Sequence, residues 1–596
     1  MSSVFRIFRM FSLLLFAGAL AACAQMAGPP GASGGREQVL LKQLPTAEFL
    51  SEPQSLWVGG QVASLYVNQS GRIAFDLGAS TQLLDEGAPV RGGKYLTLRQ
   101  NGNTLYALWW SHQNAKALYF RASPDGGKTF APVQIVNSAE GVLPPYEFVA
   151  DDSGVLAAAY TDEREPGYQI YFNRTDASGK KWQEKDLRLD NSKAVSVLGG
   201  AAKPQASEPQ LARLGQNLVV TWQEVAQDGA KAFQRVVSRM SPDMGKTWQK
   251  EVEVYRGSQS PSAFQMVVVG KQIVLAGDLS GAGVQAWRTL DAGHSWQALG
   301  ALPGSAEFVN SQLRLASQGD RVYAVYTAEK AELKSQIQAG VLDAAQGQWQ
   351  GPAQQLDPKE FSLTKSISPD IAALPGGGAV AVWQDFRAIR PNVYLSYSSP
   401  DGKSWSPAFA VQQDEGRYGA ITPRLAVRDG RATVFYQRFV DDGRTRTDYT
   451  LAALNYDAKA GALALAPSVP AVSVEQKKNR LRERVDAFWR LRTEDKFANT
   501  YGSFDPAFRS TTSQKAFSSF QGNLLFHSYQ IDKLEILGNI ARVSVKTNFE
   551  VPVTEILGQK FSQPPTDALM TNEWVWMHND WYMVYQTPLG NRSLEY

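Results

Sequence analysis

The sequence predicts a mainly β chain, in which a β-propeller of six or seven blades precedes a small α+β domain. Two observations predict this fold class. A turn motif built around an aspartate recurs every 48 to 67 residues between Asp125 and Asp457, each time among short β-branched and aromatic runs. After about residue 470, the apolar period becomes helical before strand-like runs return. We therefore expect the propeller over 51–469 and the α+β domain over 470–596.

The composition excludes several classes of function. The 596 residues carry 60 basic and 57 acidic side chains, and a net charge of +3 gives no reason to expect nucleic acid as a partner. One cysteine excludes a disulfide framework within the chain and a metal site built on several thiolates. The four histidines are scattered, which argues against a histidine-built metal centre. The sequence implies no metal and no organic cofactor, and a Ca²⁺ ion among the loop carboxylates is the alternative.

The first 22 residues have the pattern of a signal peptide. Arg6 and Arg9 precede an apolar run over 10–22, which is short for a membrane span. The run ends in Leu-Ala-Ala, directly before Cys23, the only cysteine of the chain. This ending resembles the bacterial lipoprotein box. The alternative is an ordinary secretory signal followed by a chance cysteine.

The lipoprotein resemblance implies cleavage after residue 22 and lipidation of Cys23. Because Ala24 is not an aspartate, it also implies an outer-membrane lipoprotein, in the periplasmic or the surface leaflet. Acyl chains would then hold the protein on the membrane. Residues 23–50 are expected to form a tether, since their first part is rich in Ala, Gly and Pro.

Each repeat unit contains four predicted strands in the same order. A weak strand opens the unit, and an apolar strand that often ends in an aromatic residue follows. A polar loop leads to a third strand, the aspartate motif and a fourth strand, which suits a propeller blade. Residues 62–76 are similar to the third and fourth strands without the aspartate, which leaves the number of blades open by one.

The aspartate motif has a mechanical explanation. In the copy over 123–130 (SPDGGKTF), a short aspartate side chain can accept hydrogen bonds from a tight turn, glycine supplies a positive φ, and the aromatic residue packs between sheets. We therefore expect a structural role rather than chemistry for these aspartates: Asp125, Asp176, Asp243, Asp291, Asp343 and Asp401.

These motifs resemble the Asp-box, or BNR repeat, of sialidases and related propellers. The resemblance covers about 380 residues and implies the propeller fold. Sialidases hold a substrate carboxylate with three arginines and use a tyrosine nucleophile, a glutamate and an acid/base aspartate. The Arg-Ile-Pro motif of these enzymes is absent, and the sequence does not settle whether Arg314, Arg387 and Arg424 cluster.

A ligand-binding face is predicted at the end of the propeller opposite the motif turns. In a four-stranded antiparallel blade, the loops between the second and third strands gather there with the connections between blades. Charged residues on one concave face suit a glycan or another polar ligand, whereas internal salt bridges are the alternative. The candidate residues are Asp162, Arg164, Glu208, Glu224, Asp385, Arg387 and Arg424; Tyr146, Glu147 and Asp370 occupy the same connections.

The last 125 residues predict helices followed by an antiparallel sheet. Leu481, Val485, Phe488 and Trp489 recur at helical spacing, and a hairpin is expected to turn at 579–580. This order resembles the nuclear-transport-factor-two-like (ketosteroid-isomerase-like) α+β cone, which implies a pocket or a dimerising module. Asp505 and His527 are its polar candidates.

The function predicted from these features is that of a lipid-anchored envelope protein. Its propeller face is expected to bind a glycan or an envelope protein without catalysis. The main alternative is an exo-sialidase-like glycoside hydrolase. A further alternative is an assembly factor for an envelope complex, with the C-terminal domain as a dimer contact.

Overall fold

The computed structural model describes most of the chain beyond residue 38. The described residues are 39–46, 52–85, 95–111, 116–196, 202–229, 231–330, 335–357, 365–388, 390–411, 418–428, 430–441, 446–457, 472–520, 524–556, 559–577 and 579–585. The predicted signal peptide and Cys23 lie outside them.

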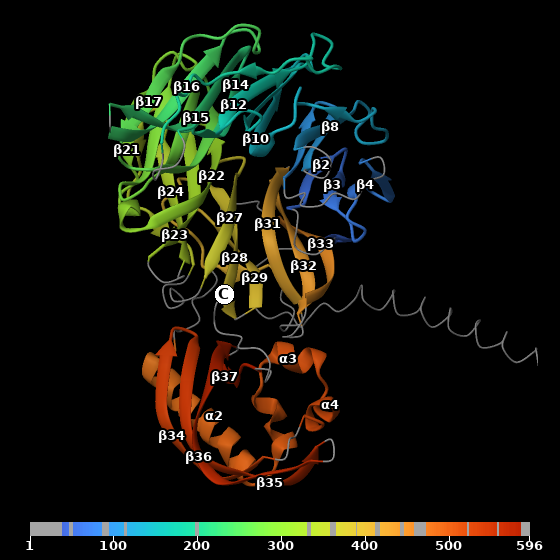
Figure 1. The fold of residues 1–596 in the computed structure, drawn as a ribbon, viewed down its shortest axis with the longest axis vertical. Coiled ribbons are helices and arrows are strands. Elements are labelled where there is room, and N and C mark those ends of the chain that lie inside the picture. The colour runs from blue at the N-terminus through green and yellow to red at the C-terminus, as the bar shows by residue number, and fades with distance from the viewer. Residues whose placement is uncertain are drawn as a thin grey trace, which may run out of the picture. The chain divides into compact units, whose positions relative to one another are not determined.

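Eight antiparallel sheets follow one another in the described residues up to 457 (Figure 1). The first four are β2 (Gln54–Val58), β3 (Gln61–Val67), β4 (Ile73–Leu77) and β5 (Ser80–Leu83); β6 (Leu96–Asn101), β7 (Thr104–Ser111), β8 (Ala117–Ser123) and β9 (Gln134–Ile135); β10 (Val142–Ala150), β11 (Leu156–Asp162), β12 (Gln169–Arg174) and β13 (Leu187–Arg188); β14 (Ala206–Leu214), β15 (Asn217–Asp228), β16 (Lys231–Ser241) and β17 (Val252–Gly257).

The fifth to eighth sheets repeat this order. They are β18 (Pro261–Val269), β19 (Gln272–Leu279), β20 (Gly283–Thr289) and β21 (Gln297–Ala301); β22 (Val309–Gln318), β23 (Arg321–Glu329), β24 (Ser335–Asp343), β25 (Gln348–Trp349) and β26 (Gln354–Gln355); β27 (Ser366–Ala373), β28 (Ala379–Ala388), β29 (Arg390–Tyr397) and β30 (Phe409–Ala410); β31 (Tyr418–Arg428), β32 (Arg431–Asp441), β33 (Arg446–Asp457) and β1 (Val39–Pro45).

The second strands of the sheets are largely buried, because neighbouring sheets pack against them. Every residue of β11 and of β19 is buried. Their sequences are therefore continuous apolar runs and not alternating ones. One hydrophobic cluster joins Tyr106 of β7 to Tyr160 of β11, and another joins Leu218 of β15 to Ala157 of β11. Adjacent sheets are thus held together by shared side-chain packing.

Sheet 8 contains a strand from the start of the described chain. Strand β1 pairs with β33, so that Val39 lies opposite Asn455. The predicted tether over 23–50 is therefore wrong at its end, since residues 39–45 belong to a sheet. The tether prediction rested on composition, and composition does not reveal a strand whose partner lies at the far end of the propeller.

Sheet 1 corrects a second prediction. Residues 62–76 were expected to be a third and fourth strand, but they fall in β3 and β4, the second and third strands of their sheet. Within the described residues there are eight sheets, more than the six or seven predicted units. The turn of sheet 1, Gly78 and Ala79, contains no aspartate motif, which is why residues 62–76 left the number of units open by one in the sequence.

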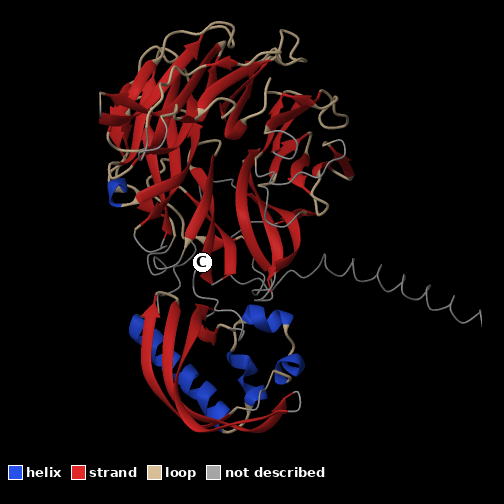
Figure 2. Cartoon of the chain, in the orientation of Figure 1, coloured by secondary structure: helices blue, strands red, loops and turns tan. Residues whose placement is uncertain are grey.

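The C-terminal residues form a helical layer and a meander of four strands (Figure 2). The helices are α2 (Val474–Thr493), the 3-10 helix η3 (Phe497–Ser503), α3 (Pro506–Thr511) and α4 (Gln514–Ser518); the strands are β34 (Leu525–Leu537), β35 (Ile540–Ile556), β36 (Gln559–Met577) and β37 (Asp580–Met583). The predicted helix and hairpin are present, but Asp580 already belongs to β37 and pairs with Met577, so the predicted turn at 579–580 is displaced by one residue.

A capping box starts α2. The Ser473 side chain accepts from the Gln476 N–H, and the Gln476 side chain accepts from the Ser473 N–H. The helix buries its apolar stripe, including Leu481 and Trp489, in one cluster with Trp581 of the sheet. Among the described residues, no helix is long and apolar enough to cross a bilayer.

Candidate functional site

The Asp-box turns are hydrogen-bonded within themselves. Asp125 accepts from the Ser123 hydroxyl at 2.8 Å, the Thr129 N–H at 2.9 Å and the Thr129 hydroxyl at 2.6 Å. These donors favour the ionised carboxylate and lower the pKa of Asp125 to about 2. Asp243 and Asp291 accept from matching donors.

The remaining boxes are less complete. Asp176 accepts from the Ser178 hydroxyl and the Lys180 N–H, and Asp401 accepts from the Ser399 hydroxyl and the Lys403 N–H. Asp343 accepts from the Gln346 N–H. In all six copies, the carboxylate is therefore occupied by its own turn, an arrangement suited to a structural role.

Close packing between sheets explains the box glycine and aromatic residue. Gly245 has φ +82°, and a Cβ there would lie 2.3 Å from Cζ of Phe172 in sheet 3. Trp248 of the same box packs edge-on against Phe172, with ring centroids 4.9 Å apart. The box thus anchors one sheet to the preceding sheet.

The opposite end of the sheets has a different construction. We call the first strand of each sheet, in the order given above, its inner strand: β2, β6, β10, β14, β18, β22, β27 and β31. Six consecutive inner strands, β10, β14, β18, β22, β27 and β31, carry a register shift near their start. In five of them a non-glycine residue at the bulge has φ between 50° and 57°: Glu208, Ala263, Gln312, Ser368 and Thr422. Bulges of this kind redirect side chains, and left-handed residues of this kind cluster at functional sites.

These bulges line a cavity of about 950 Å³, which we call the central cavity. Residues from the inner strands of all eight sheets form its wall. Seven of the lining residues are ionisable acids or arginines: Glu52, Arg99, Glu147, Glu208, Arg314, Asp370 and Arg424. Amide side chains also line it: Gln54, Gln100, Gln210, Gln265, Gln312 and Gln384.

Arg424 is neutralised inside the cavity. Its guanidinium forms an ion pair with Glu52 and donates to the carbonyl of Pro423 at 2.8 Å. Electrostatic attraction by Glu52 and Asp370 raises the pKa of Arg424, although burial acts in the opposite direction as the largest single influence. The side chain is 16% exposed, so the pair is shielded from solvent on the arginine side.

Arg314 differs from Arg424. Within the described residues it forms no ion pair, and its guanidinium makes one hydrogen bond, a 3.4 Å contact to the carbonyl of Leu313. Burial lowers the pKa of Arg314, and the positive charge of Arg424 lowers it further. The charges of Asp370, Glu52 and Glu147 act to raise this pKa without forming an ion pair with Arg314 in the described residues. A half-buried cation with unused donors is expensive to maintain unless an anion joins it.

Glu147 is the acid whose titration is most displaced in this cavity. Burial raises its pKa to about 7, although Arg99 and Arg314 act to lower it. The neighbouring Tyr146 points elsewhere, since its hydroxyl donates to the carbonyl of Tyr95 at 2.8 Å. Glu147 is therefore a carboxyl group that changes charge near neutral pH.

The predicted face residues divide into two groups. Glu208 and Arg424 line the central cavity together with Glu147 and Asp370. Asp162 and Arg164 instead pair with each other at 2.6 Å, and Asp385 and Arg387 pair at 2.5 Å.

Both local pairs repeat one arrangement. The aspartate accepts from the backbone N–H of the arginine two residues later, at 2.7 Å in each case. Each arginine then stacks on a tyrosine of the next strand, Arg164 over Tyr171 at 4.1 Å and Arg387 over Tyr394 at 3.9 Å. These pairs hold the loop to the sheet and are not among the cavity-lining residues.

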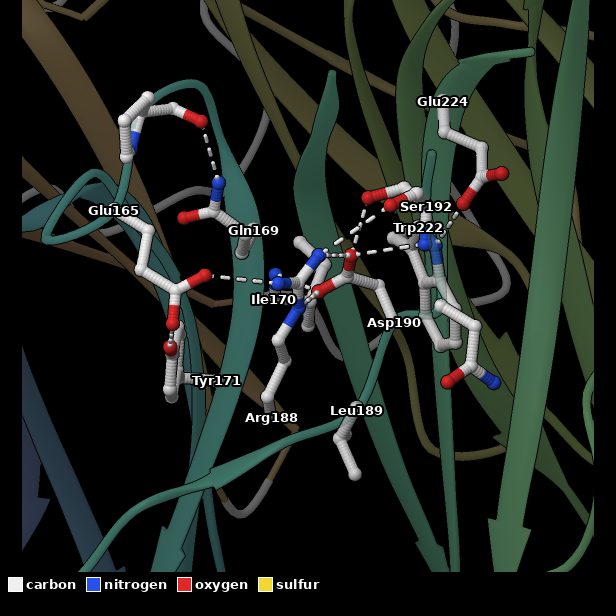
Figure 3. Close-up of polar contacts among 12 residues, drawn as sticks. Glu165, Gln169, Ile170, Tyr171, Arg188, Leu189, Asp190, Ser192, Trp222 and Glu224 are labelled. Atoms are coloured by element: carbon white, nitrogen blue, oxygen red, sulfur yellow. Dashed lines mark hydrogen bonds and ion pairs between the residues drawn. The ribbon is translucent and has the colours of Figure 1, made fainter. Parts of the chain in front are cut away.

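Glu224 is likewise occupied by neighbours, as Figure 3 shows for its bond with Trp222. Its carboxylate accepts from the Trp222 indole at 2.9 Å and from Arg235 at 2.6 Å. Close by in the same view, Arg188 bridges Glu165 and Asp190.

A tyrosine–glutamate contact occurs in this network. Tyr171 donates to Glu165 at 3.2 Å, and burial together with the Glu165 charge raises the pKa of Tyr171 to about 12. A raised pKa opposes formation of the phenolate. Neither residue lines the central cavity.

Sequence reasoning missed Arg99, Tyr95 and Glu52. A usable signal was present for the bulged strands, because a proline follows the bulge residue in Glu208-Pro209, Ser368-Pro369 and Thr422-Pro423. Proline lacks an N–H and belongs at bulges within sheets. Arg99 and Tyr95 belong to β6 and its approach, for which no register shift is recorded, so no comparable signal marks them.

The polar candidates of the C-terminal domain have local roles. Asp505 caps α3, since its carboxylate accepts from the Phe508 N–H at 3.0 Å. Nε2 of His527 lies 3.5 Å from Oε2 of Glu550, and the His527 side chain is 45% exposed.

No protein-family model matches the chain, and no curated protein matches it by sequence. Solved structures are similar in shape at low identity. The NanB sialidase from Streptococcus pneumoniae has a TM-score of 0.33 and 8% identity, covering 72% of this chain and 95% of that one. The α-L-arabinofuranosidase Arb93A from Fusarium graminearum has a TM-score of 0.35 and 14% identity, covering 60% and 92%.

A polysaccharide lyase, an ulvan lyase, has a TM-score of 0.40 and 9% identity, covering 63% of this chain and 97% of that one. The sheets of this chain are similar in fold to these sialidase, arabinofuranosidase and lyase structures. Because all three TM-scores lie below 0.5, the function proposed for this chain rests on its own sheets and side chains.

Proposed function

We propose that the central cavity binds an anionic, hydroxyl-rich ligand, such as a carboxylated glycan, without cleaving it. The observation that carries this proposal is Arg314, a half-buried guanidinium with unused donors and no ion pair among the described residues. A carboxylate on the ligand would supply the missing charge and accept two hydrogen bonds.

The other lining residues support a sugar-like ligand. Six glutamine side chains offer both donors and acceptors to hydroxyl groups, and Tyr95 offers an aromatic face. A non-cleaving role is supported by Tyr146, whose hydroxyl is engaged by a backbone carbonyl and so is not poised beside Glu147 as a nucleophile.

The setting proposed for this binding is the bacterial cell envelope. The lipoprotein-like ending at Cys23 supports an acylated, outer-membrane protein that presents the cavity to glycan or to an envelope protein. We also propose that the eight sheets close into one ring. Pairing of β1 with β33 and packing of Val62 in sheet 1 with Phe435 in sheet 8 support closure.

Calorimetric titration with uronic and sialic acid sugars tests the binding proposal. We expect binding of the acids and none of their neutral or methyl-ester counterparts. Arg314→Ala is expected to weaken binding about 100-fold, since a charge-assisted bidentate contact is lost. Arg213→Ala is the matched control: Arg213 lies on inner strand β14 but outside the cavity lining, and pairs with Asp152. Equal binding of acid and ester would refute the proposal.

A glycoside hydrolase of sialidase type is the second candidate, and Glu147 favours it. A carboxyl group with a pKa of about 7 beside arginines suits a general acid. Fluorogenic sialosides and uronides test this candidate. Turnover that Glu147→Gln abolishes, while acid binding persists, would establish hydrolysis; no turnover on either substrate class would leave the binding proposal.

A further inference from the structure

The central cavity contains unpaired charges of both signs. Arg424 is neutralised by Glu52, but Arg99 and Arg314 form no ion pair within the described residues. On the acidic side, Glu208 has neither an ion pair nor a hydrogen bond among those residues, and Glu147 has no ion pair. A ligand that carried an anion alone would satisfy the arginines and leave the two glutamates without partners.

Glu208 reaches the cavity through its bulge. Its φ of 57° places a non-glycine residue in the left-handed region, between the register positions of Ser207 and Gln210. The equivalent bulge positions of four other sheets hold neutral residues, namely Ala263, Gln312, Ser368 and Thr422. Sheet 4 is therefore the one of these five that puts a charge at this position.

Tyr95 lies near the same carboxylate. The tyrosine is 38% exposed and lines the cavity, and Trp110 supports its ring edge-on at 6.3 Å between centroids. Glu52 and Glu208 line the same cavity as Tyr95, and their charges raise the pKa of Tyr95, after burial as the largest cause. An aromatic face beside a carboxylate is a common site for an ammonium group.

We propose that Glu208 and Tyr95 form a subsite for an ammonium group, so that the ligand is dipolar: a sugar acid that also carries a free amine. This inference rests on the proposed function, because Arg314 receives the carboxylate of the same ligand. The amine donates to Glu208 and lies against Tyr95, while the acid occupies the guanidinium of Arg314. Glu208 and Arg314 then each meet an opposite charge, whereas an N-acylated ligand would leave Glu208 without one.

A matched pair of ligands tests the subsite on the full chain. Muramic acid carries a carboxylate and an amine, and N-acetylmuramic acid carries the same carboxylate with a neutral amide. We expect the amine form to bind about tenfold more tightly, the size of one charge-assisted contact. Glu208→Gln should bring the ratio of the two affinities close to one, and Tyr95→Leu should reduce it. Glu163→Gln, a carboxylate paired with Lys116 outside the cavity lining, should leave the ratio as it is.

The outcomes separate the two proposals. If both sugars bind with equal affinity, the ammonium subsite is refuted and the anionic site stands. If neither sugar nor any other sugar acid binds, the proposed function fails and the subsite fails with it. A ratio that persists in folded Glu208→Gln protein would also refute the subsite. Thermal unfolding of each variant establishes that the protein compared is folded.

Discussion

The two ends of the propeller sheets differ in how completely their charged side chains are paired. At the Asp-box end, each of the six carboxylates accepts from at least one donor of its own turn, as Asp243 does from Ser241 and Thr247. At the cavity end, Arg314 and Glu208 lack ion-pair partners among the described residues. Charged groups with hydrogen-bond or ion-pair partners stabilise a fold, whereas buried charged groups without partners raise its free energy and can be stabilised by a ligand. Substitutions at the two ends should therefore differ in kind.

The largest loss of stability at a fixed pH is expected for a box glycine. Gly245→Ala places a Cβ at 2.3 Å from Phe172 and in a left-handed conformation. We expect a loss of about 2 to 4 kcal/mol in unfolding free energy, from overpacking and backbone strain together. Gly270→Ala has a similar positive φ but open space, and should cost about 1 kcal/mol. Denaturant unfolding measures both, and equal losses would show that packing against Phe172 contributes nothing.

An effect of comparable size concerns Glu147 and pH. Its folded pKa of about 7 lies above the unfolded value, so folding favours the protonated form. Stability should therefore fall by about 3 to 4 kcal/mol as the pH rises from the unfolded pKa, near 4.3, to about 7, and then level off. Glu147→Gln should remove this fall. The same pH-dependent loss in the variant would assign it to another group.

A smaller effect separates two arginines. Arg314→Met removes a poorly paired cation, so stability should stay level or rise by about 1 kcal/mol while binding of acidic ligands is lost. Arg239→Met, on strand β16 leading to a box, should instead lose about 1 to 2 kcal/mol, because Arg239 donates to the carbonyls of Gln249 and Leu189. Thermal unfolding without ligand measures both. A destabilised Arg314→Met protein would mean that this cation is satisfied in the folded state.

The smallest effect ranks the boxes. Asp243 accepts from two hydroxyls and a backbone N–H, whereas Asp343 accepts from the Gln346 N–H. Asp243→Ala should therefore lower the unfolding temperature more than Asp343→Ala. Burial is the largest single influence on the pKa of Asp243 and acts to raise it, but the hydrogen-bond donors together lower it. The contribution of Asp243 is therefore present above the unfolded pKa and is lost as the pH falls through the folded pKa. The difference between the variants should shrink in acid.

The local parts of this fold were predictable from sequence. The boxes repeat residue by residue, and their aspartate, glycine and aromatic residues each meet a need within one turn or between adjacent sheets. Sheet 1 was recognised only in part, with its strands misordered, because it lacks the motif, and strand β1 was missed because its partner lies about 400 residues away. A search for sequence patterns detects repeats within short segments, but it does not detect the pairing of strands that lie far apart in the chain.

The candidate site was predictable in part. Glu208 and Arg424 were placed on the connections between blades, and both line the cavity. Asp162, Glu224 and Asp385 were equally good candidates in the sequence. In the structure, however, each carboxylate is paired with a nearby arginine or indole. Sequence shows which side chains carry charge, but whether a charge already has a partner depends on the three-dimensional neighbours.

Strand β1 has a consequence for biosynthesis. Its hydrogen-bond partners in β33 are made last among the propeller strands, so sheet 8 cannot be completed while the chain is still being synthesised up to that point. Until β33 is made, β1 has no partner strand, and its N–H and C=O groups are unpaired. A segment of this kind is prone to pair with other chains. We therefore expect β1 to need protection from aggregation, for example by a chaperone, until β33 has been synthesised. This period is longer than for a sheet whose four strands are consecutive in the chain.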